Sequence, residues 1–496
     1  MQTLRLPLDL NSDYALQIEG RNIKEVNSVE LFSTRPGDEG LAGRERALAM
    51  AAVMTSTTMA VFDGAIVNVA LPPIAHALAV PAQSAVWVAN GYLLSAAMTL
   101  AIFAALARRV GFRTLFAFGL SLFTLASLGC ALSSSLSTLT GWRIVQGIGG
   151  AATLSIAPAI LRSVFPTRLL GRILGLHALL IATSTAIAPV LGGTLLEALS
   201  WQWLFAINIP LGAIALTLTL QAIPNNSTPG RGPFDIAGAA LSALMLGGFI
   251  MAANAFSRPG SPQTQLWIAA GYGGVAMAAG LLFIGRQRRA PQPLMPLELF
   301  ASARFSLAAL TSLASFVSQG MTFIALPFLF QSVYGYSVFT SALLFTPWPL
   351  GIMLAAPHAG RLADRYPAAL ISTLGLGIFT LGLTLLALLP DQAQAWDIGI
   401  RSLVCGLGFG FFQSPNNREM LANASRENSG YASGVLAIMR TFGQCLGGAL
   451  VGVILAVLAP AGAQAAGAVR LSLWIAVLAT VLALLFSLSR IRKQPD

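Results

Sequence analysis

The chain has 496 residues, of which 56% are hydrophobic and only 9% are charged, too few charges to cover the surface of a soluble protein of this length. The formal net charge of +11 comes from arginines in short clusters between apolar runs, which argues against a nucleic-acid-binding face. Neither Lys24 nor Lys493 stands in the Gly-Lys-Ser/Thr step of a P-loop, which excludes an ATPase of that type.

Residues 1–46 are polar and hold eight of the 18 carboxylates. They lack the basic region, apolar region and cleavage site of a secretory signal. We interpret them either as a mobile, disordered cytoplasmic tail or as the product of a misassigned start codon, because Met50 and Met54 lie at the edge of the first apolar run.

From residue 47 onward, long apolar stretches alternate with brief polar breaks. A bilayer core of about 30 Å takes about 20 helical residues. By this measure the sequence predicts an all-α polytopic membrane protein with about fourteen transmembrane helices. The predicted spans are 47–72, 84–106, 113–133, 138–161, 171–197, 202–222, 235–255, 266–285, 304–330, 339–363, 368–389, 396–420, 430–457 and 470–490.

Basic residues mark alternate connections between these spans. Connections of the other parity hold few of them, and Arg258, Arg401 and Arg470 are the exceptions. Because cytoplasmic loops are enriched in Lys and Arg, the pattern predicts that both termini are cytoplasmic, which requires an even number of spans. The basic series comprises Arg108, Arg109, Arg113, Arg162, Arg168, Arg172, Arg231, Arg286, Arg288, Arg289, Arg361, Arg365, Arg418, Arg426, Arg490, Arg492 and Lys493.

Two similar segments indicate an internal repeat. Residues 104–111 follow the second predicted span and residues 360–367 end the tenth, so each closes the second helix of a six-helix set. This pattern predicts two pseudo-symmetric halves with the substrate between them, as in secondary transporters. The predicted divisions are the tail 1–46, the N-terminal half 47–222, a two-helix insert with linkers 223–303, the C-terminal half 304–490 and a basic cytoplasmic tail 491–496.

Several motifs in the expected helices carry a family resemblance that extends from about residue 47 to the end. They are Asp63-Gly64-Ala65-Ile66-Val67-Asn68-Val69-Ala70-Leu71-Pro72, Arg143-Ile144-Val145-Gln146-Gly147, Ala188-Pro189-Val190-Leu191-Gly192-Gly193, and the run from Trp201 through Asn208 to Pro210. With them the chain resembles the major facilitator superfamily, specifically its fourteen-helix drug:proton antiporter branch of bacterial multidrug exporters. It departs from the family at Arg108, where the first cytoplasmic motif normally has aspartate, and at Ala188, where the antiporter motif has glycine.

Asp63 is the predicted centre of proton coupling, together with Arg143. Between residues 47 and 230 the only other carboxylate is Glu197, at a helix end. An ionised acid inside a membrane helix is costly and desolvation favours its neutral form, which suits Asp63 to binding and releasing a proton. Arg143 would favour the ionised acid if it lay nearby. The alternatives are a structural, hydrogen-bonded aspartate and an arginine that reaches the membrane interface.

The antiporter motif combines Pro189 with Gly192 and Gly193. Proline removes a helix hydrogen bond and glycine lets another helix approach, so the motif predicts either bending during gating or tight packing. The resemblance also implies a cytoplasmic motif in two copies, with its usual acid-mediated latch expected only on the C-terminal side. Its residues are Arg109, Gly111, Arg113, Gly360, Asp364 and Arg365.

Polar and aromatic residues within the spans are candidates for the substrate cavity, since an apolar cavity with a few polar groups suits amphiphilic ligands. Arg440 is a weaker functional candidate, with capping of a neighbouring helix as the alternative. The cavity candidates are Asn68, Asn90, Tyr92, Gln146, Gln319, Phe323, Trp348, Gln413 and Asn416.

The predicted function is a proton-coupled antiporter of the bacterial cytoplasmic (inner) membrane that exports small amphiphilic or cationic organic compounds by alternating access. Protons are the coupling ion, and no other cofactor, metal or enzymatic activity is expected. The expected partners are the small-molecule substrate and the lipid bilayer, without nucleic acid, in either a monomer or a complex with a periplasmic adaptor. The alternatives are a dedicated metabolite exporter of the same fold and a non-transporting membrane sensor or scaffold.

Overall fold

The computed structural model describes residue 31 and the ranges 38–225, 234–258, 260–290, 293–424, 429–459 and 465–491. Most of the predicted tail, the residues Arg231, Arg426, Arg492 and Lys493, and the side chain of Arg108 lie outside the described residues. Over the described ranges all regular structure is helical. Fourteen of these helical spans are long and apolar enough to cross a bilayer, which confirms the predicted fold class.

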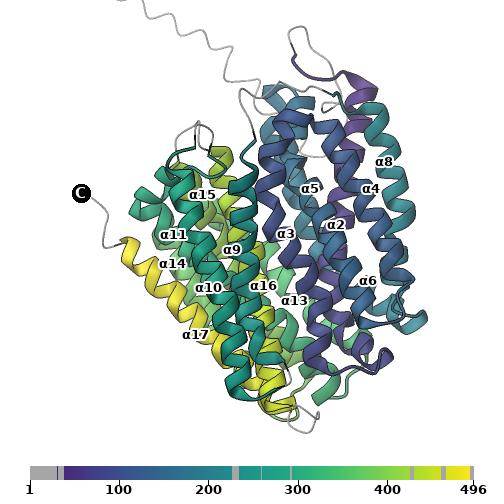
Figure 1. Cartoon of the computed structure of the whole chain (residues 1–496), viewed down its shortest axis with the longest axis vertical. Coiled ribbons are helices and arrows are strands. Elements are labelled where there is room, and N and C mark those ends of the chain that lie inside the picture. The colour runs from purple at the N-terminus through teal and green to yellow at the C-terminus, as the bar shows by residue number, and fades with distance from the viewer. Residues whose placement is uncertain are drawn as a thin grey trace, which may run out of the picture.

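The first six spans pack together as one half (Figure 1). α5 contacts both α3 and α4, and α2 contacts α6 and α8. The bounds are α2 Gly43–Ala77, α3 Ala82–Val110, α4 Phe112–Ala131, α5 Leu136–Val164, α6 Leu170–Ala198, and α7 Trp203–Ala206 with α8 Asn208–Ala222, which together make the sixth span.

The last six spans form the other half. α15 contacts α13 and α14, and α11 contacts α16 and α17. The bounds are α11 Ala303–Phe328 extended by the turn η4 Leu329–Val333, α12 Val338–Phe345 with α13 Pro347–Leu362, α14 Ala368–Ala387, α15 Ala395–Ala422, α16 Ser429–Leu458 and α17 Ala465–Ile491.

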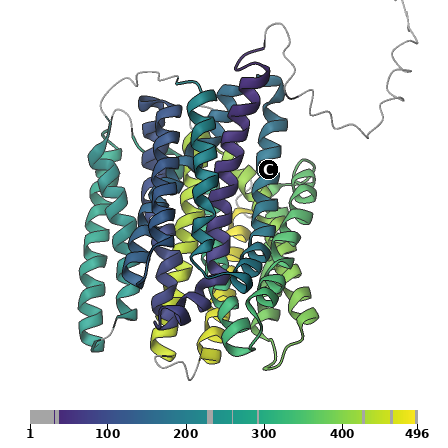
Figure 2. The same cartoon turned by 90° about the vertical axis from the view of Figure 1, so that its right-hand side faces the viewer.

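The two inserted helices, α9 Ile236–Asn254 and α10 Pro262–Gln287, form a hairpin at the edge of the bundle (Figure 2). They pack against each other, and α9 contacts α3 and α16, one helix from each half. Asp235 accepts hydrogen bonds from Arg286 Nε at 2.5 Å and Gln287 Nε2 at 2.9 Å. Burial alone would raise the pKa of Asp235, but the bonds from Arg286, a backbone amide and Gln287 hold that pKa below its usual value.

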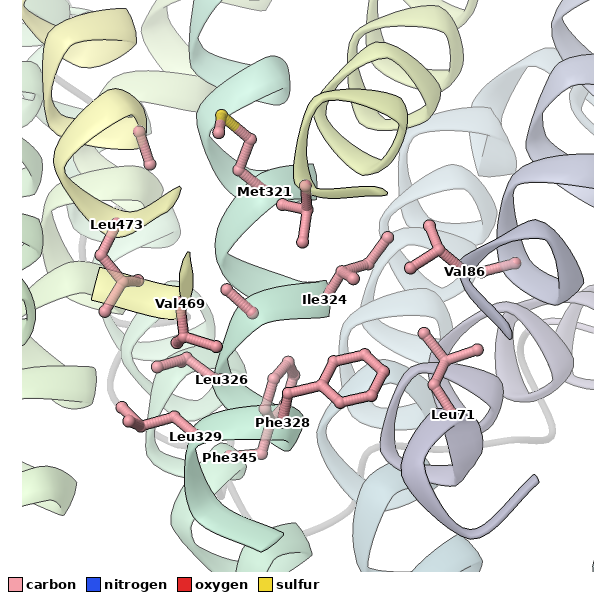
Figure 3. Packing of buried hydrophobic residues seen from close by; sticks show 14 of the residues in the cluster. Leu71, Val86, Met321, Ile324, Leu326, Phe328, Leu329, Phe345, Val469 and Leu473 are labelled. Atoms are coloured by element: carbon pink, nitrogen blue, oxygen red, sulfur yellow. The ribbon is translucent and has the colours of Figure 1, made fainter. Parts of the chain in front are cut away.

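The spans alternate in direction and their number is even, so α2 begins and α17 ends at one end of the bundle, here named the terminal end. At the other end, the far end, the halves close through apolar side chains. Figure 3 shows Leu71 and Val86 of the N-terminal half facing Ile324 and Phe328 of α11. All four side chains are buried in one hydrophobic cluster that includes residues of both halves.

The final residues of the predicted tail contact the terminal end of the bundle. Asp38 forms an ion pair with Arg168 at 2.6 Å. The backbone N–H of Leu41 donates to the carbonyl of Val164 at 3.0 Å. A chain that began at Met50 would therefore lack contacts that tie this segment to α5 and to the turn before α6.

Glycines give the closest helix contacts in the C-terminal half. A Cβ at Gly375 of α14 would lie 2.4 Å from the backbone nitrogen of Phe412 in α15, whereas a Cβ at Gly377 would meet nothing within 4 Å. Lipid tails are as apolar as core side chains, so association of membrane helices depends on such close packing. The α14–α15 contact therefore requires glycine at position 375.

Gly375→Ala is expected to lower the midpoint of thermal unfolding in detergent, because the added methyl pushes against backbone at a cost of about 1–3 kcal/mol. Gly377→Ala, on the same helix, is the matched control. It is expected to be neutral or stabilising, since alanine is favoured over glycine within a helix by about 0.5–1 kcal/mol. Equal midpoints for the two variants would contradict the predicted contact.

Candidate functional site

A buried carboxylate in α2 is the centre of the candidate site. The whole Asp63 residue is only 3% exposed, and its Oδ2 forms an ion pair with Nη1 of Arg143 in α5. Its Oδ1 accepts hydrogen bonds from Gln146 Nε2 at 2.9 Å and from Asn208 Nδ2 at 3.1 Å. Three helices thus meet at one side chain, and both carboxylate oxygens are bonded.

Arg143 is held by further contacts. Its Nε donates to the carbonyl of Val88 in α3 at 2.8 Å, and its Nη1 also donates to Gln146 Oε1 at 2.6 Å. The guanidinium carbon lies 4.6 Å from the centre of the Tyr92 ring and 5.5 Å from that of Phe205, both cation–π distances. Since Arg143 is only 1% exposed, the structure excludes the alternative in which it reaches the membrane interface.

The central cavity lies beside this ion pair, between the two halves. It consists of two adjoining cavities of about 150 and 390 Å³ that share Thr185, Phe323, Arg440 and Gln444. The smaller one is also lined by Ala60, Val61, Gly64, Ala65, Asn68, Tyr92, Leu93, Ala96, Leu100, Ala151, Leu154, Gly320, Ile324 and Thr441. The larger cavity is also lined by Ala178, Ile181, Ala182, Phe316, Gln319, Pro349, Ile352, Ala356, Phe409, Gln413, Ser414 and Asn417.

Tyr92 separates the cavity from the ion pair. It lines the smaller cavity while its ring packs on the guanidinium of Arg143. On α2, Gly64 follows Asp63 directly and lines the same cavity, as does Asn68, whose Nδ2 donates to the Gly64 carbonyl at 3.4 Å. The helix that carries the carboxylate, α2, therefore also lines the cavity, together with α3 and α5 of the same half.

The structure brings five of the predicted cavity residues to this cavity: Asn68, Tyr92, Gln319, Phe323 and Gln413. It places the other four elsewhere.

Gln146 lies in the Asp63 network. Trp348 is 1% exposed and packs its ring on Phe323 and Phe379, with centroids 5.2 and 5.5 Å apart. Trp348 thus fills the core of the C-terminal half and is not among the residues that line the cavity.

Asn90 and Asn416 are buried in helix contacts. Asn90 of α3 faces α16, where a Cβ at Gly448 would lie 2.2 Å from Asn90 Oδ1. Asn416 donates to Ser312 Oγ and accepts from Arg490 Nη1, each at 2.8 Å. Both side chains thus lie outside the described cavity. Asn90 packs in a close contact between helices, and Asn416 is held by polar partners within the C-terminal half.

The antiporter motif lies on both surfaces of α6. A Cβ at Gly192 would be 3.0 Å from the side chain of Ile66 in α2, inside the N-terminal half. A Cβ at Gly193 would be 2.8 Å from Cβ of Ala342 in α12, across the interface between the halves at the far end. Pro189 has no N–H to donate to the carbonyl of Thr185, one turn back, which leaves the helix weaker next to the cavity.

The two copies of the cytoplasmic motif lie at the terminal end. Gly111 joins α3 to α4 with φ of +92°, a left-handed conformation that favours glycine. The guanidinium of Arg109 lies 5.2 Å from the ring centre of Phe234. Asp364 forms an ion pair with Arg418 of α15.

The other motif residues do not converge on one site. A Cβ at Gly360 would approach Ser414 Oγ at 3.5 Å, an ordinary contact. Arg113 and Arg365 lie near helix ends at the terminal end, two residues after Gly111 and directly after Asp364. The acid-mediated latch expected on the C-terminal side corresponds to the ion pair between Asp364, which follows α13, and Arg418. The tertiary structure adds the identity of the partner.

Two residues of the Asp63 network were not predicted as site residues. Asn208 stands in the run 201–210, which carried the family resemblance but no assigned role. Ser127 of α4 accepts a hydrogen bond from Gln146 Nε2 at 2.8 Å, and one serine in an apolar span gives no signal in the sequence. Both are buried, at 2% and 0% exposure.

Comparisons with known proteins agree on one family. The family model of the Major Facilitator Superfamily matches residues 53–448. The chain is 42% identical to the uncharacterized transporter YebQ of Escherichia coli K12, over 84% of this chain and 91% of YebQ.

Two further relatives have more specific names. The chain is 30% identical to the riboflavin transporter RibZ of Clostridioides difficile strain 630, over 78% of this chain and 84% of RibZ. It is 31% identical to the multidrug resistance protein Stp of Mycobacterium tuberculosis, over 83% of this chain and 76% of Stp. Among solved structures, a D-xylose-proton symporter is similar with a TM-score of 0.62 at 15% identity, covering 89% of this chain and 97% of that chain.

Arg143→Leu is expected to destabilise the protein by about 3–5 kcal/mol, because it leaves the Asp63 carboxylate buried without its cation. The double variant Asp63→Asn/Arg143→Leu is expected to recover part of that loss, since no unpaired charge stays buried. Chemical unfolding of the four proteins in a double-mutant cycle measures the coupling. Arg470→Leu, which breaks an exposed ion pair with Asp391, is the control and should cost under about 1 kcal/mol. Additive effects of the two single substitutions would contradict the predicted coupling.

Proposed function

The chain belongs to the major facilitator superfamily, and on that premise we propose that this membrane transporter is a proton-coupled antiporter that exports small amphiphilic organic compounds. The observation that carries the proposal is the buried Asp63–Arg143 pair, which is separated from the central cavity by the Tyr92 ring. None of the described residues lining the cavity is a carboxylate. The proton site and the substrate site are thus distinct but adjoining.

Proton binding to Asp63 would remove its charge and with it the attraction for Arg143. The arginine would keep its bonds to the Val88 carbonyl and to Gln146 Oε1. One charge of a buried pair would then be uncompensated, which is costly in the membrane interior. Protonation therefore favours a different arrangement of α2 and α5, and α2 also lines the cavity, so the proton and the substrate act on the same helix.

The far end is closed by apolar packing between the halves, and the larger cavity extends along α15 to Asn417, near the terminal end of that helix. We assign the terminal end to the cytoplasm of a bacterial cell, because the basic connections lie there. In this orientation substrate enters from the cytoplasm. A proton that enters from the outside while access switches would drive export, as in alternating access between two repeats.

A dedicated exporter of one metabolite is the second candidate. The name of RibZ records riboflavin transport, which favours this reading, whereas the name of Stp records multidrug resistance and favours a broad substrate range. A transport panel of unrelated amphiphilic compounds separates the two. Transport of a single compound class would favour the dedicated exporter.

In proteoliposomes with an imposed proton gradient, the wild-type protein is expected to move a fluorescent amphiphilic dye while protons move the opposite way. Asp63→Asn is expected to reduce the gradient-driven movement of dye and of protons to background. The amide of asparagine has the same shape as the carboxyl group but does not bind a proton in the pH range of the assay. Dye fluorescence and internal pH are followed together.

Asp397→Asn is the matched control, since it removes a carboxylate that pairs with Arg401 outside the cavity. It should transport as the wild type does. Coupled transport that survives in Asp63→Asn would place proton binding at another residue. If the wild type moved no compound of the panel, the proposal of broad export would be wrong, while the family assignment would stand.

Gly193→Val is expected to reduce transport strongly without unfolding the protein, because the added side chain prevents α6 from closing on Ala342 at the far end. The matched control is Gly175→Val on the same helix, where a Cβ meets nothing within 4 Å. Spin labels on cysteines at Ser200 and Ser332, both at the far end, report the separation of the halves. A longer distance is expected in Gly193→Val alone, and identical distances in both variants would contradict the closing role.

A further inference from the structure

Arg440 is a single charge inside the central cavity. It is the twelfth residue of α16 and lies about 17 Å along that helix from Ser429, within the membrane-spanning part of the bundle. Its side chain lines both adjoining cavities and is exposed there. The cavity therefore presents a guanidinium to whatever occupies it.

No described residue compensates this charge. In the part of the chain that the structure describes, Arg440 forms no hydrogen bond and no ion pair, and no residue lining either cavity is acidic. Asp63 is already bound by Arg143, Gln146 and Asn208. The capping role considered for Arg440 from the sequence would need a bond to a helix carbonyl and is wrong for the described residues.

Other arginines inside the bundle differ in this respect. Arg143 pairs with Asp63, and Arg490 donates to Asn416 Oδ1 at 2.8 Å and to Ser487 Oγ at 2.7 Å. A charged side chain within a membrane protein is costly and typically pairs with another group or marks a substrate pathway. Because Arg440 has no partner among the residues that the structure describes and faces a cavity, its partner is expected to be a ligand.

We propose that the central cavity recognises organic anions, with Arg440 binding the acidic group of the substrate. This inference rests on the proposed function and narrows its substrate class. A guanidinium binds a carboxylate, sulfonate or phosphate through paired, charge-assisted hydrogen bonds. A cationic compound would instead meet a like charge in a cavity without a carboxylate, which disfavours the cationic substrates expected from the sequence.

The remaining lining fits an apolar body on the same ligand. Phe316, Phe323 and Phe409 line the larger cavity, whose volume of about 390 Å³ suits a drug-sized molecule. Gln319 and Gln444 lie on its wall and bond to each other at 2.8 Å, which leaves the Gln319 amide N–H groups for a ligand oxygen. The ligand class is thus an amphiphilic anion with an aromatic or aliphatic body.

The test uses two probes with one aromatic body: 8-anilinonaphthalene-1-sulfonate and its neutral relative N-phenyl-1-naphthylamine, which lacks the sulfonate. Their fluorescence measures equilibrium binding to the purified full chain in neutral detergent, with empty micelles subtracted. Arg440→Gln is expected to weaken binding of the sulfonate about ten- to a hundredfold, the loss typical of a hydrogen bond to a charged group. It should change binding of the neutral probe by less than about threefold.

Arg304→Gln, which removes a positive charge outside the cavity at the start of α11, is the matched control and should bind both probes as the wild type does. Unchanged sulfonate binding in Arg440→Gln, or equal weakening of both probes, would overturn the proposal. If that variant does not fold, competition on the wild type decides. There 1-naphthoate should displace the sulfonate probe at concentrations about tenfold lower than 1-naphthamide, and equal potency would overturn the proposal.

An anionic phospholipid carries the same chemistry as a soluble organic anion. Titration with phosphatidylglycerol against phosphatidylcholine separates these sources. If phosphatidylglycerol displaces the sulfonate probe and phosphatidylcholine does not, the natural ligand of Arg440 is an anionic lipid. If the two lipids have equal effects, the natural ligand is a soluble organic anion. Either source requires Arg440 as the anion-binding residue. Because no proton gradient is used, failure here and failure of proton-coupled transport are separate outcomes.

Discussion

The cost of charge inside a membrane is the constraint on which the site depends. Asp63 is tolerated in the middle of α2 because an arginine and two amides from α5 and α8 bond both of its oxygens. Meeting that requirement brings the helices of the N-terminal half together at one point. The same requirement makes the arrangement sensitive to protonation, since a neutral acid no longer holds its partner. In the proposed function, the contact that stabilises the fold is therefore also the one that responds to the proton.

The second arginine in this region has the opposite environment. Arg143 is enclosed by protein groups, whereas Arg440 faces a cavity and has no partner among the described residues. Tyr92 lies between the two environments, since its ring packs on Arg143 and the residue also lines the cavity. An enclosed ion pair can accept a proton, because a proton needs no cavity. A guanidinium that faces a cavity can bind a larger ligand. In the proposed function, arginine therefore acts in two ways: Arg143 pairs with the proton-binding acid, and Arg440 binds the anion.

Glycine positions decide where the halves and helices approach each other. Gly193 allows α6 to meet α12 across the interface at the far end, and Gly448 allows α16 to meet Asn90 of α3. These contacts join the two halves, whereas Gly375 joins helices within one half. Because packing rather than hydrophobic burial holds membrane helices together, small residues mark both the fixed and the separable contacts. Only the location of each glycine relative to the interface distinguishes the two kinds.

The sequence by itself determined the fold class and the fourteen spans, and it singled out Asp63 and Arg143, because long apolar runs and rare charges leave few alternatives in a membrane. Only the tertiary structure decided that these two side chains pair. It did not decide which polar residues face the cavity: Gln319 does, while Asn416 bonds Ser312 and Arg490 inside the C-terminal half. It also left residues 1–46 as either a mobile tail or the product of a misassigned start codon, and did not show that Asp38 contacts Arg168. A membrane span can be recognised from the hydropathy of its own residues, without knowledge of its neighbours. The direction in which a buried polar side chain points depends on helix rotation and on neighbours far away in the sequence, 104 residues for Asn416 and Ser312. Only the tertiary structure therefore decided which residues line the cavity and that Arg440 is exposed in it.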